Sequence, residues 1–104
     1  MTKVRVSAVT SLDTETAGIY TYHEDHLHKP TYKHVSKDLY LWWDGWWKVD
    51  NGDWYSSDKA NPLGFIRSEE DVGCPELVGS GKWKYYDDDM PHSAITVEQG
   101  RLHF

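Results

Sequence analysis

Two turn dipeptides inside a tryptophan-rich stretch constrain this chain more than any other feature. Asp44-Gly45 and Asn51-Gly52 both lie within residues 39–57, and both are favoured in two-residue β-hairpin turns. Two chain reversals so close together predict three antiparallel strands in series. The sequence therefore predicts a Trp-rich three-stranded meander at the centre of the fold.

Two-residue turns would pair Trp43 with Trp46 and Trp42 with Trp47. Because directly opposed residues share a face of a sheet, one face becomes almost wholly apolar and is predicted to be core: Tyr40, Trp42, Trp47, Val49 and Trp54. The other face is mixed, as expected of a wetter surface: Leu39, Leu41, Trp43, Trp46, Lys48, Asp50, Asp53 and Tyr55.

Alternating apolar and polar residues recur along the rest of the chain, and no amphipathic helix stands out. Further strands are expected at 4–9, 18–22, 30–35, 65–67, 83–86 and 94–97, with a loop at 13–17, breakers at 62–64 and 87–91, and one helical turn at 68–71. We expect residues 1–104 to form a single all-β module, a small antiparallel barrel or sandwich of roughly seven or eight short strands. Pairing of residues 4–9 with residues 94–97 would protect the two sheet edges.

Composition and net charge restrict the classes of molecule that the chain is expected to bind. The 104 residues amount to about one domain, and six Trp and seven Tyr against two Phe indicate a core built from rings. The net charge of −6 argues against nucleic acid and anionic membranes as partners. No apolar run approaches the roughly 20 residues that span a bilayer, and the amino terminus lacks the apolar stretch of a signal peptide. The single Cys74 cannot form an internal disulfide, which suits a reducing compartment.

Several motifs occur in order between Gly18 and Val97: Gly18-Ile19-Tyr20, Pro30-Thr31-Tyr32-Lys33, Leu39-Tyr40-Leu41-Trp42-Trp43, Gly45-Trp46-Trp47, Gly64-Phe65-Ile66-Arg67-Ser68, Cys74-Pro75, Trp83-Lys84-Tyr85-Tyr86-Asp87 and Ser93-Ala94-Ile95-Thr96-Val97. This segment resembles an uncharacterised aromatic-rich accessory module found in multidomain proteins of marine invertebrates and protists. The resemblance implies a repeat-like, often extracellular domain without catalytic residues. The chain departs from that pattern in its tight Asp44-Gly45 link and in the lack of an export signal.

Exposed aromatic rings can stack on sugars or on proline side chains, and six Trp exceed what a core of this size usually needs. We therefore expect a ligand-binding platform at Trp43, Trp46 and Tyr55, with Lys48 on the same face. The competing interpretation is that these rings cover the open side of a thin domain or are buried by the amino-terminal segment.

Two places in the sequence carry candidate metal ligands. His23, His26 and His28 are candidate zinc ligands, and His26 and His28 would share a face of a strand, but no fourth ligand stands at a recognisable spacing. Asp87-Asp88-Asp89 and the predicted Asp50/Asp53 pair gather carboxylates in turns without the spacing of a calcium loop. A solvated hairpin tip and ordinary turn chemistry are the favoured interpretations.

The sequence carries little that indicates catalysis. Cys74, before Pro75, is the one candidate nucleophile, and a packed thiol is the favoured interpretation because no signature surrounds it. Glycines are scattered singly, so no phosphate-binding loop and no cofactor are predicted. The expected function is non-catalytic recognition of carbohydrate or an extended peptide. The alternatives are a structural spacer domain without a ligand site and, more weakly, a metal-dependent protein using the histidines.

Overall fold

The computed structural model describes residues 3–7, 16–57, 65–79, 81–85, 88–91 and 95–100. Its elements follow the chain in the order β1 (Lys3–Ser7), β2 (Gly18–His26), β3 (Lys29–His34), β4 (Leu39–Trp43), β5 (Trp47–Asn51), α1 (Gly52–Ser57), β6 (Ile66–Ser68), the 3₁₀ helix η2 (Pro75–Leu77), β7 (Lys84–Tyr85), β8 (Asp88–Pro91) and β9 (Thr96–Gln99). The predicted strands at 18–22, 30–35 and 65–67 thus correspond to β2, β3 and β6.

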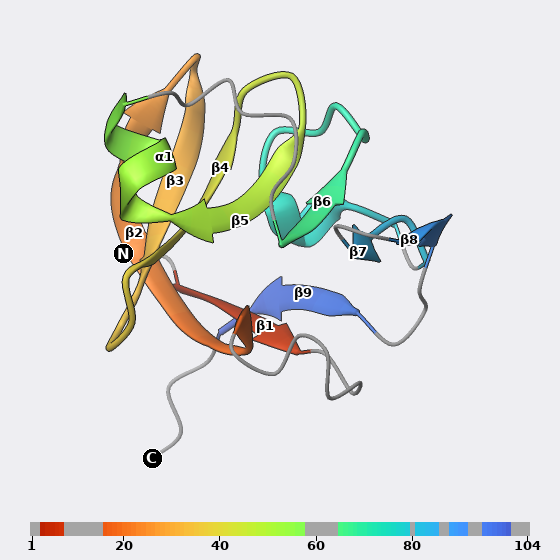
Figure 1. Ribbon diagram of the computed structural model, residues 1–104. Helices are drawn as coiled ribbons and strands as arrows, with labels where there is room; N and C mark the ends of the chain where they lie inside the picture. The colour runs from red at the N-terminus through yellow and green to blue at the C-terminus, as the bar shows by residue number, and fades with distance from the viewer. Residues whose placement is uncertain are drawn as a thin grey trace.

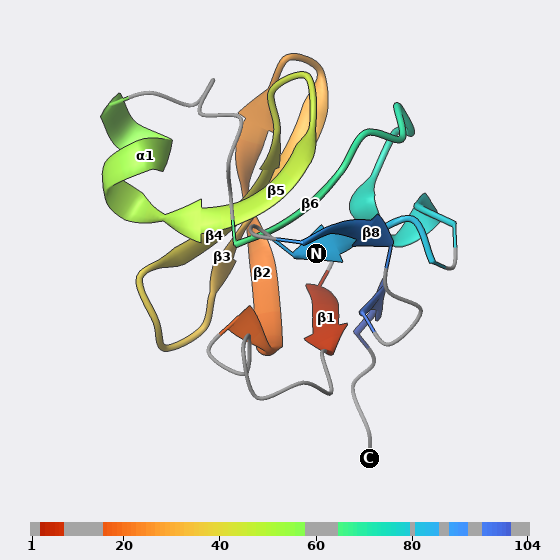
Figure 2. The same cartoon turned by 45° about the vertical axis from the view of Figure 1, so that its right-hand side comes forward.

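The nine described strands form one antiparallel sheet in the order β8-β7-β6-β5-β4-β3-β2-β1-β9. The sheet curls on itself, and α1 lies on its outer side, away from β9 (Figures 1 and 2). The all-β antiparallel prediction is confirmed. One expected breaker is instead a strand, since residues 88–91 form β8 beside β7.

The expected pairing of the chain's two end strands is confirmed. β1 runs antiparallel to β9, with Val6 opposite Val97 and Ser7 opposite Thr96. The backbone N–H of Gly100 donates to the Lys3 carbonyl at 2.8 Å and extends the pair. Residues 8, 9 and 94 of the predicted strands lie outside the described residues, as do 13–15, 62–64, 86 and 87 of other predicted segments.

One apolar cluster fills the inner side of the curled sheet. It draws on strands from both ends of the chain, and its members are Val4, Val6, Tyr20, Tyr32, Leu39, Leu41, Trp47, Val49, Ile66, Trp83, Tyr85, Ile95 and Val97. Rings supply much of its bulk, as the composition predicts, and Trp47 and Trp83 are almost completely buried.

The predicted register of the Trp-rich hairpin is wrong by one residue. Trp43 lies opposite Trp47, and Trp42 lies opposite Lys48, so the connection is the three-residue loop 44–46 with Gly45 at φ +84°. Because side chains alternate between the two faces of a sheet, a shift of one residue in the strand pairing moves every side chain of one strand to the opposite face. Leu41 and Val49 therefore pair inside the sheet.

The second predicted turn is also wrong, because Asn51 caps a helix. Its side-chain oxygen accepts the backbone N–H of Trp54 at 3.2 Å, and the chain continues as α1. Asn is favoured both in hairpin turns and at helix N-caps, so the dipeptide alone could not distinguish the two. The third strand beside β5 is β6 instead, with Trp47 opposite Ser68.

The predicted helical turn at 68–71 is wrong as well. Ser68 ends β6, and the short helix forms later, at Pro75–Leu77, with Cys74 at its N-cap. Proline is well suited to the first helical position because it has no N–H to leave unsatisfied.

Candidate functional site

The aromatic side chains divide between the two sides of the sheet. Trp42 is fully buried but lies outside the inner core cluster, because it shares the α1 side with Lys48. The ring of Tyr55, the buried residue of α1, packs edge-on to Trp42 at 5.2 Å between centroids. Trp42 was expected to face the same core as Trp47, so that part of the facing prediction is wrong.

A β-bulge in β2 brings Glu24 to the α1 side of the sheet, where Tyr55 lies. Tyr22 lies opposite Tyr32, but the next pair is Glu24 with Thr31, so His23 is an extra residue and Glu24 changes face. The Tyr55 hydroxyl donates to the Glu24 carboxylate and lies 3.2 Å from the Thr31 hydroxyl oxygen. Burial, with the Glu24 hydrogen bond second, raises the pKa of Tyr55 well above its usual value.

The four residues predicted as a ligand platform do not form one surface. Tyr55 is 5% exposed and Lys48 is fully buried, both on the α1 side. Trp43 points to the opposite face of β4 from Trp42, and both Trp43 and Trp46 are half-buried. The prediction is wrong for Tyr55 because it lies in a helix instead of a third strand. It is wrong for Lys48 because the shifted register places Lys48 opposite Trp42 on the α1 side.

Trp43 and Trp46 do belong to one end of the molecule, which we call the loop end: the turns at 27–28 and 44–46 and the segment 69–73. The ring of His26 lies 3.4 Å from the Asp44 carboxylate and joins the first two turns. The Lys29 ammonium donates to the Asp71 carboxylate at 2.6 Å and to the Val72 carbonyl at 2.8 Å, which attaches the third segment. Both views place the β2–β3 and β4–β5 turns at the same end (Figures 1 and 2).

Each of the two tryptophans at the loop end has a cationic side chain over its ring. The Lys29 ammonium lies 4.7 Å from the ring centre of Trp43, whose edge packs against Trp47. The guanidinium of Arg67, on β6, lies 5.4 Å from the ring centre of Trp46. Cation–π contacts of this kind fix the orientation of a partly exposed ring.

The tip of the β2–β3 hairpin has an unusual backbone. His26 lies opposite Lys29, and the two turn residues between them, Leu27 and His28, have φ of +53° and +62°. A type I′ turn needs positive φ at both positions and normally uses Asn-Gly, because other residues pay a steric cost there. Leu27 is also 54% exposed, so this tip exposes an apolar side chain to solvent.

The histidines do not form a metal site. β2 ends at His26 and His28 is a turn residue, so the expected shared face is wrong. His23 packs against the rings of Tyr40 and Tyr55. Among the described residues, no group of three His, Cys, Asp or Glu side chains could hold a metal ion.

Asp50 and Asp53 do not oppose each other either. Asp50 is a buried β5 residue opposite Tyr40, whereas Asp53 lies in the first turn of α1. Residues 88 and 89 of the acidic run belong to β8, and Asp87 lies outside the described residues. Burial, followed by the nearby Glu76 carboxylate, raises the pKa of the Cys74 thiol, so little of it is the reactive thiolate at neutral pH.

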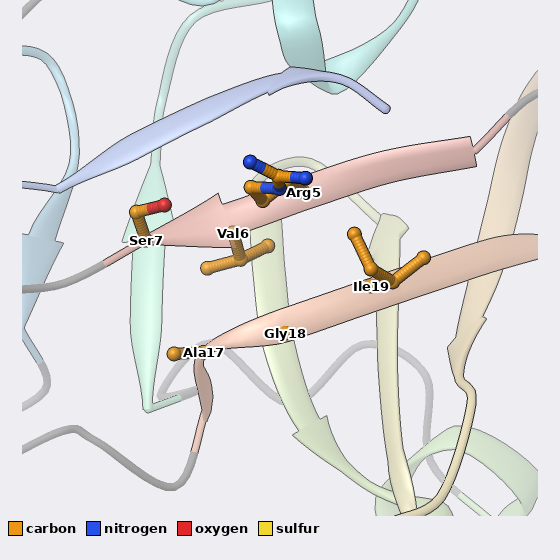
Figure 3. Close-up of a pocket in the computed structure, with 6 residues that line it drawn as sticks. All are labelled: Arg5, Val6, Ser7, Ala17, Gly18 and Ile19. Carbon is orange, nitrogen blue, oxygen red and sulfur yellow. The ribbon is translucent and has the colours of Figure 1, made fainter. Parts of the chain in front are cut away.

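Among the described residues, two groups line a hollow on the surface. One hollow, of about 350 Å³, is lined by Ser68, Glu69, Glu70, Lys82 and Lys84 next to the loop end. The other, of about 380 Å³, lies at the ends of β1 and β2, where Arg5 and Ser7 point to one side of the strand and Val6 to the other (Figure 3). Arg5 faces Glu98 across the β1–β9 pair, so its charge already has a neighbour of opposite sign.

Sequence reasoning missed Leu27, Lys29 and Arg67. The signal for Leu27 was visible, since an apolar residue stands between two histidines in a stretch interpreted as a solvated tip. The positions of Lys29 and Arg67 depend on contacts across the sheet that local patterns do not contain. No helix of the described part is long and apolar enough to cross a membrane. A scan against protein-family models and searches of curated proteins and of solved structures found no match, so the candidate site rests on its own geometry.

Proposed function

We propose that this chain is a non-catalytic recognition module that binds an extended peptide segment of a partner protein at the loop end. The observation that carries the proposal is the exposed Leu27, held at φ +53° beside the turn that bears Trp46. Unfavourable backbone conformations persist where the surrounding structure enforces them, and they concentrate at functional sites.

The side chains at the loop end favour a peptide over a carbohydrate. Sugar-binding surfaces rely on flat aromatic faces, and Leu27 offers no such face. Trp46 is of the aromatic type that most often anchors protein recognition, and an aliphatic side chain such as Leu27 can serve as an anchor beside it. Carbohydrate remains the alternative ligand class, because the half-buried Trp43 and Trp46 rings could also stack on a sugar.

One observation favours the spacer function as a second candidate. Three of the six tryptophans, Trp42, Trp47 and Trp83, are almost completely buried and serve packing. The spacer function requires that Trp43 and Trp46 contribute to stability alone.

The experiment is a peptide array and a glycan array probed with the folded protein. We expect saturable binding to a subset of peptides, lowered at least about tenfold by Trp46→Ala or Leu27→Ser, as loss of an interface anchor would do. Trp54→Ala is the matched control, since Trp54 is 40% exposed on α1 and is not among the residues that make up the loop end.

Three outcomes oppose this proposal. Binding to neither array favours the spacer function. Peptide binding that survives both loop-end substitutions contradicts the site. Saturable glycan binding that Trp46→Ala abolishes favours the carbohydrate class instead.

A further inference from the structure

One side of the His34 ring contacts the start of β2, at the end of the strands opposite the loop end (Figure 1). The ring is 5% exposed and packs edge-on against Tyr20, with the ring centres 5.0 Å apart. Its Nε2 atom lies 3.1 Å from the Ala17 carbonyl oxygen, which can only accept, so Nε2 carries a proton and donates it. A Cβ at Gly18 would have no room beside the same Nε2, so the β2 backbone lies directly against the ring.

The other ring nitrogen of His34 is an acceptor for the loop between β3 and β4. The backbone N–H groups of Ser36 and Lys37 both donate to Nδ1, each at 3.1 Å. Because a ring nitrogen that accepts carries no proton, the ring is the neutral Nε2–H tautomer. Asn and Asp side chains accept backbone N–H groups further along the chain in the same way. His34 therefore ties the β3–β4 loop to the segment before β2.

The charged and titratable groups around His34 offer no partner to a protonated ring. The Lys33 ammonium donates to the His34 carbonyl oxygen at 3.3 Å, so one positive charge is already present. The carboxylate of Asp38 accepts the backbone N–H of Gly52 instead. Among the described residues, no carboxylate forms an ion pair with His34. The remaining neighbours are the phenol of Tyr20, which donates to the Thr16 carbonyl, the exposed Lys37, and the apolar Val4, Val6 and Leu39.

We propose that His34 is a pH switch that releases the β3–β4 loop and the segment before β2 in acid. Protonation of Nδ1 would set an N–H against two N–H donors, so the closed contacts and the proton exclude each other. Once both segments have moved off the ring, His34 accepts a proton as an ordinary histidine does, near about pH 6.5. The closed form is therefore fully favoured above that pH, and the opened form gains up to about tenfold per pH unit below it. This inference does not depend on the proposed function.

The opening at His34 is local and changes one hollow. Loops and strand ends open at a lower free energy than the centre of a sheet. Ala17 and Gly18, which lose their contact with the ring, belong to the wall of the hollow at the ends of β1 and β2 (Figure 3). The loop end is held by contacts that do not involve His34, such as that of Lys29 with Asp71. Acid therefore alters this hollow and leaves the loop end in place.

The experiment is NMR of the wild-type protein between about pH 5 and pH 7.5, the range in which histidine titrates. At neutral pH the ring ¹⁵N spectrum should show a proton on Nε2 of His34 and none on Nδ1. Native-state hydrogen exchange, corrected for the intrinsic rate at each pH, then measures opening at the Ser36 and Lys37 amides. Their protection should fall about five- to tenfold per pH unit below about pH 6.5. Protection of the Phe65 amide, which donates to the Val49 carbonyl, should stay constant.

His34→Asn separates the hydrogen bonds from the titration. Asn can accept the same two N–H groups but takes up no proton in this range, so protection of Ser36 and Lys37 should become independent of pH. His28→Asn is the matched control, because His28 is an exposed turn residue with positive φ, which Asn tolerates. It should leave the pH dependence unchanged. If His34→Asn does not fold, the wild-type tautomer and exchange data decide by themselves.

A proton on Nδ1 of His34 at neutral pH would overturn the switch, because Nδ1 could not then accept from the loop. Protection of Ser36 and Lys37 that is independent of pH in the wild-type protein would also overturn it. So would an equal fall at Phe65, which would mean global unfolding, or a fall that persists in His34→Asn.

Discussion

Tyr55 stacks on Tyr40, with ring centroids 4.3 Å apart and ring planes 4° from parallel. Tyr55 is the buried residue of α1, and its hydroxyl donates to the Glu24 carboxylate across the sheet. A helix of six residues is too short to be stable by itself, so its place on the sheet depends on this ring.

The raised pKa of Tyr55 predicts lower stability at high pH. Below about pH 10 the phenol is protonated in the folded and unfolded chain alike, and its full contribution is present. Above that pH the unfolded chain loses the proton first, so the free energy of unfolding falls as pH rises toward the folded-state pKa. Denaturant unfolding between about pH 8 and pH 11 should show this decline.

Tyr55→Phe should flatten the decline, and Tyr22 accounts for part of what remains, because its hydrogen bond to Asp25 also raises its pKa. An equally steep decline in Tyr55→Phe would contradict the assignment.

Gly18→Ala should destabilise the protein strongly. A Cβ at Gly18 would lie 2.4 Å from Nε2 of His34, and φ there is +139°. His34 cannot move aside easily, because its Nε2 lies 3.1 Å from the Ala17 carbonyl and its Nδ1 accepts the backbone N–H groups of Ser36 and Lys37. We expect a loss of about 3 kcal/mol in the free energy of unfolding.

Gly45→Ala is the matched control for Gly18→Ala. Gly45 also has positive φ, +84°, but nothing lies within 4 Å of its added Cβ. Backbone strain alone should cost about 1 to 2 kcal/mol. Equal losses at the two glycines in thermal or denaturant unfolding would contradict the close packing of Gly18 on His34.

Replacing the β2–β3 turn by Asn-Gly should stabilise the fold and weaken binding. The double variant Leu27→Asn/His28→Gly removes two strained residues and should raise the free energy of unfolding by about 1 kcal/mol or more. Binding to the array-selected peptide should fall, because the exposed Leu27 is lost. Val35→Asn, at an exposed valine of the β3–β4 loop, should change neither quantity appreciably. Unchanged peptide binding by the double variant would mean that Leu27 is not an anchor.

Cys74 should react slowly with a disulfide reagent such as DTNB at neutral pH. Burial and the Glu76 carboxylate raise its pKa, so the thiolate is scarcer than in the unfolded chain. The rate should increase on unfolding in denaturant. Faster reaction in the native protein than in the unfolded protein would indicate an activated thiol and support a catalytic role after all.

The features that were predicted correctly depend on the alternation of apolar and polar residues in strands and on the protection of sheet edges. Strands β2, β3 and β4 follow from period-two patterns, and the β1–β9 pair follows from the need to cover two sheet edges. Both arguments need only the strand character of short segments, which the local residue pattern already indicates.

The candidate site depended on details that patterns leave open. One extra residue in the loop 44–46 reversed the facing of β4 relative to β5. A bulge at His23 moved Glu24 to the side of Tyr55, and Asn51 capped a helix where a turn was expected. Each is a choice between local structures of similar free energy, and tertiary packing decided it.

The most direct test of recognition at the loop end is an NMR titration of the indole N–H resonances with an array-selected peptide. The six tryptophans provide probes in the core, on α1 and at the loop end of one molecule. We expect saturable shifts of the Trp46 and Trp43 resonances, while those of Trp54 and Trp83 stay in place. Shifts at Trp54 without shifts at Trp46 and Trp43 would contradict this expectation.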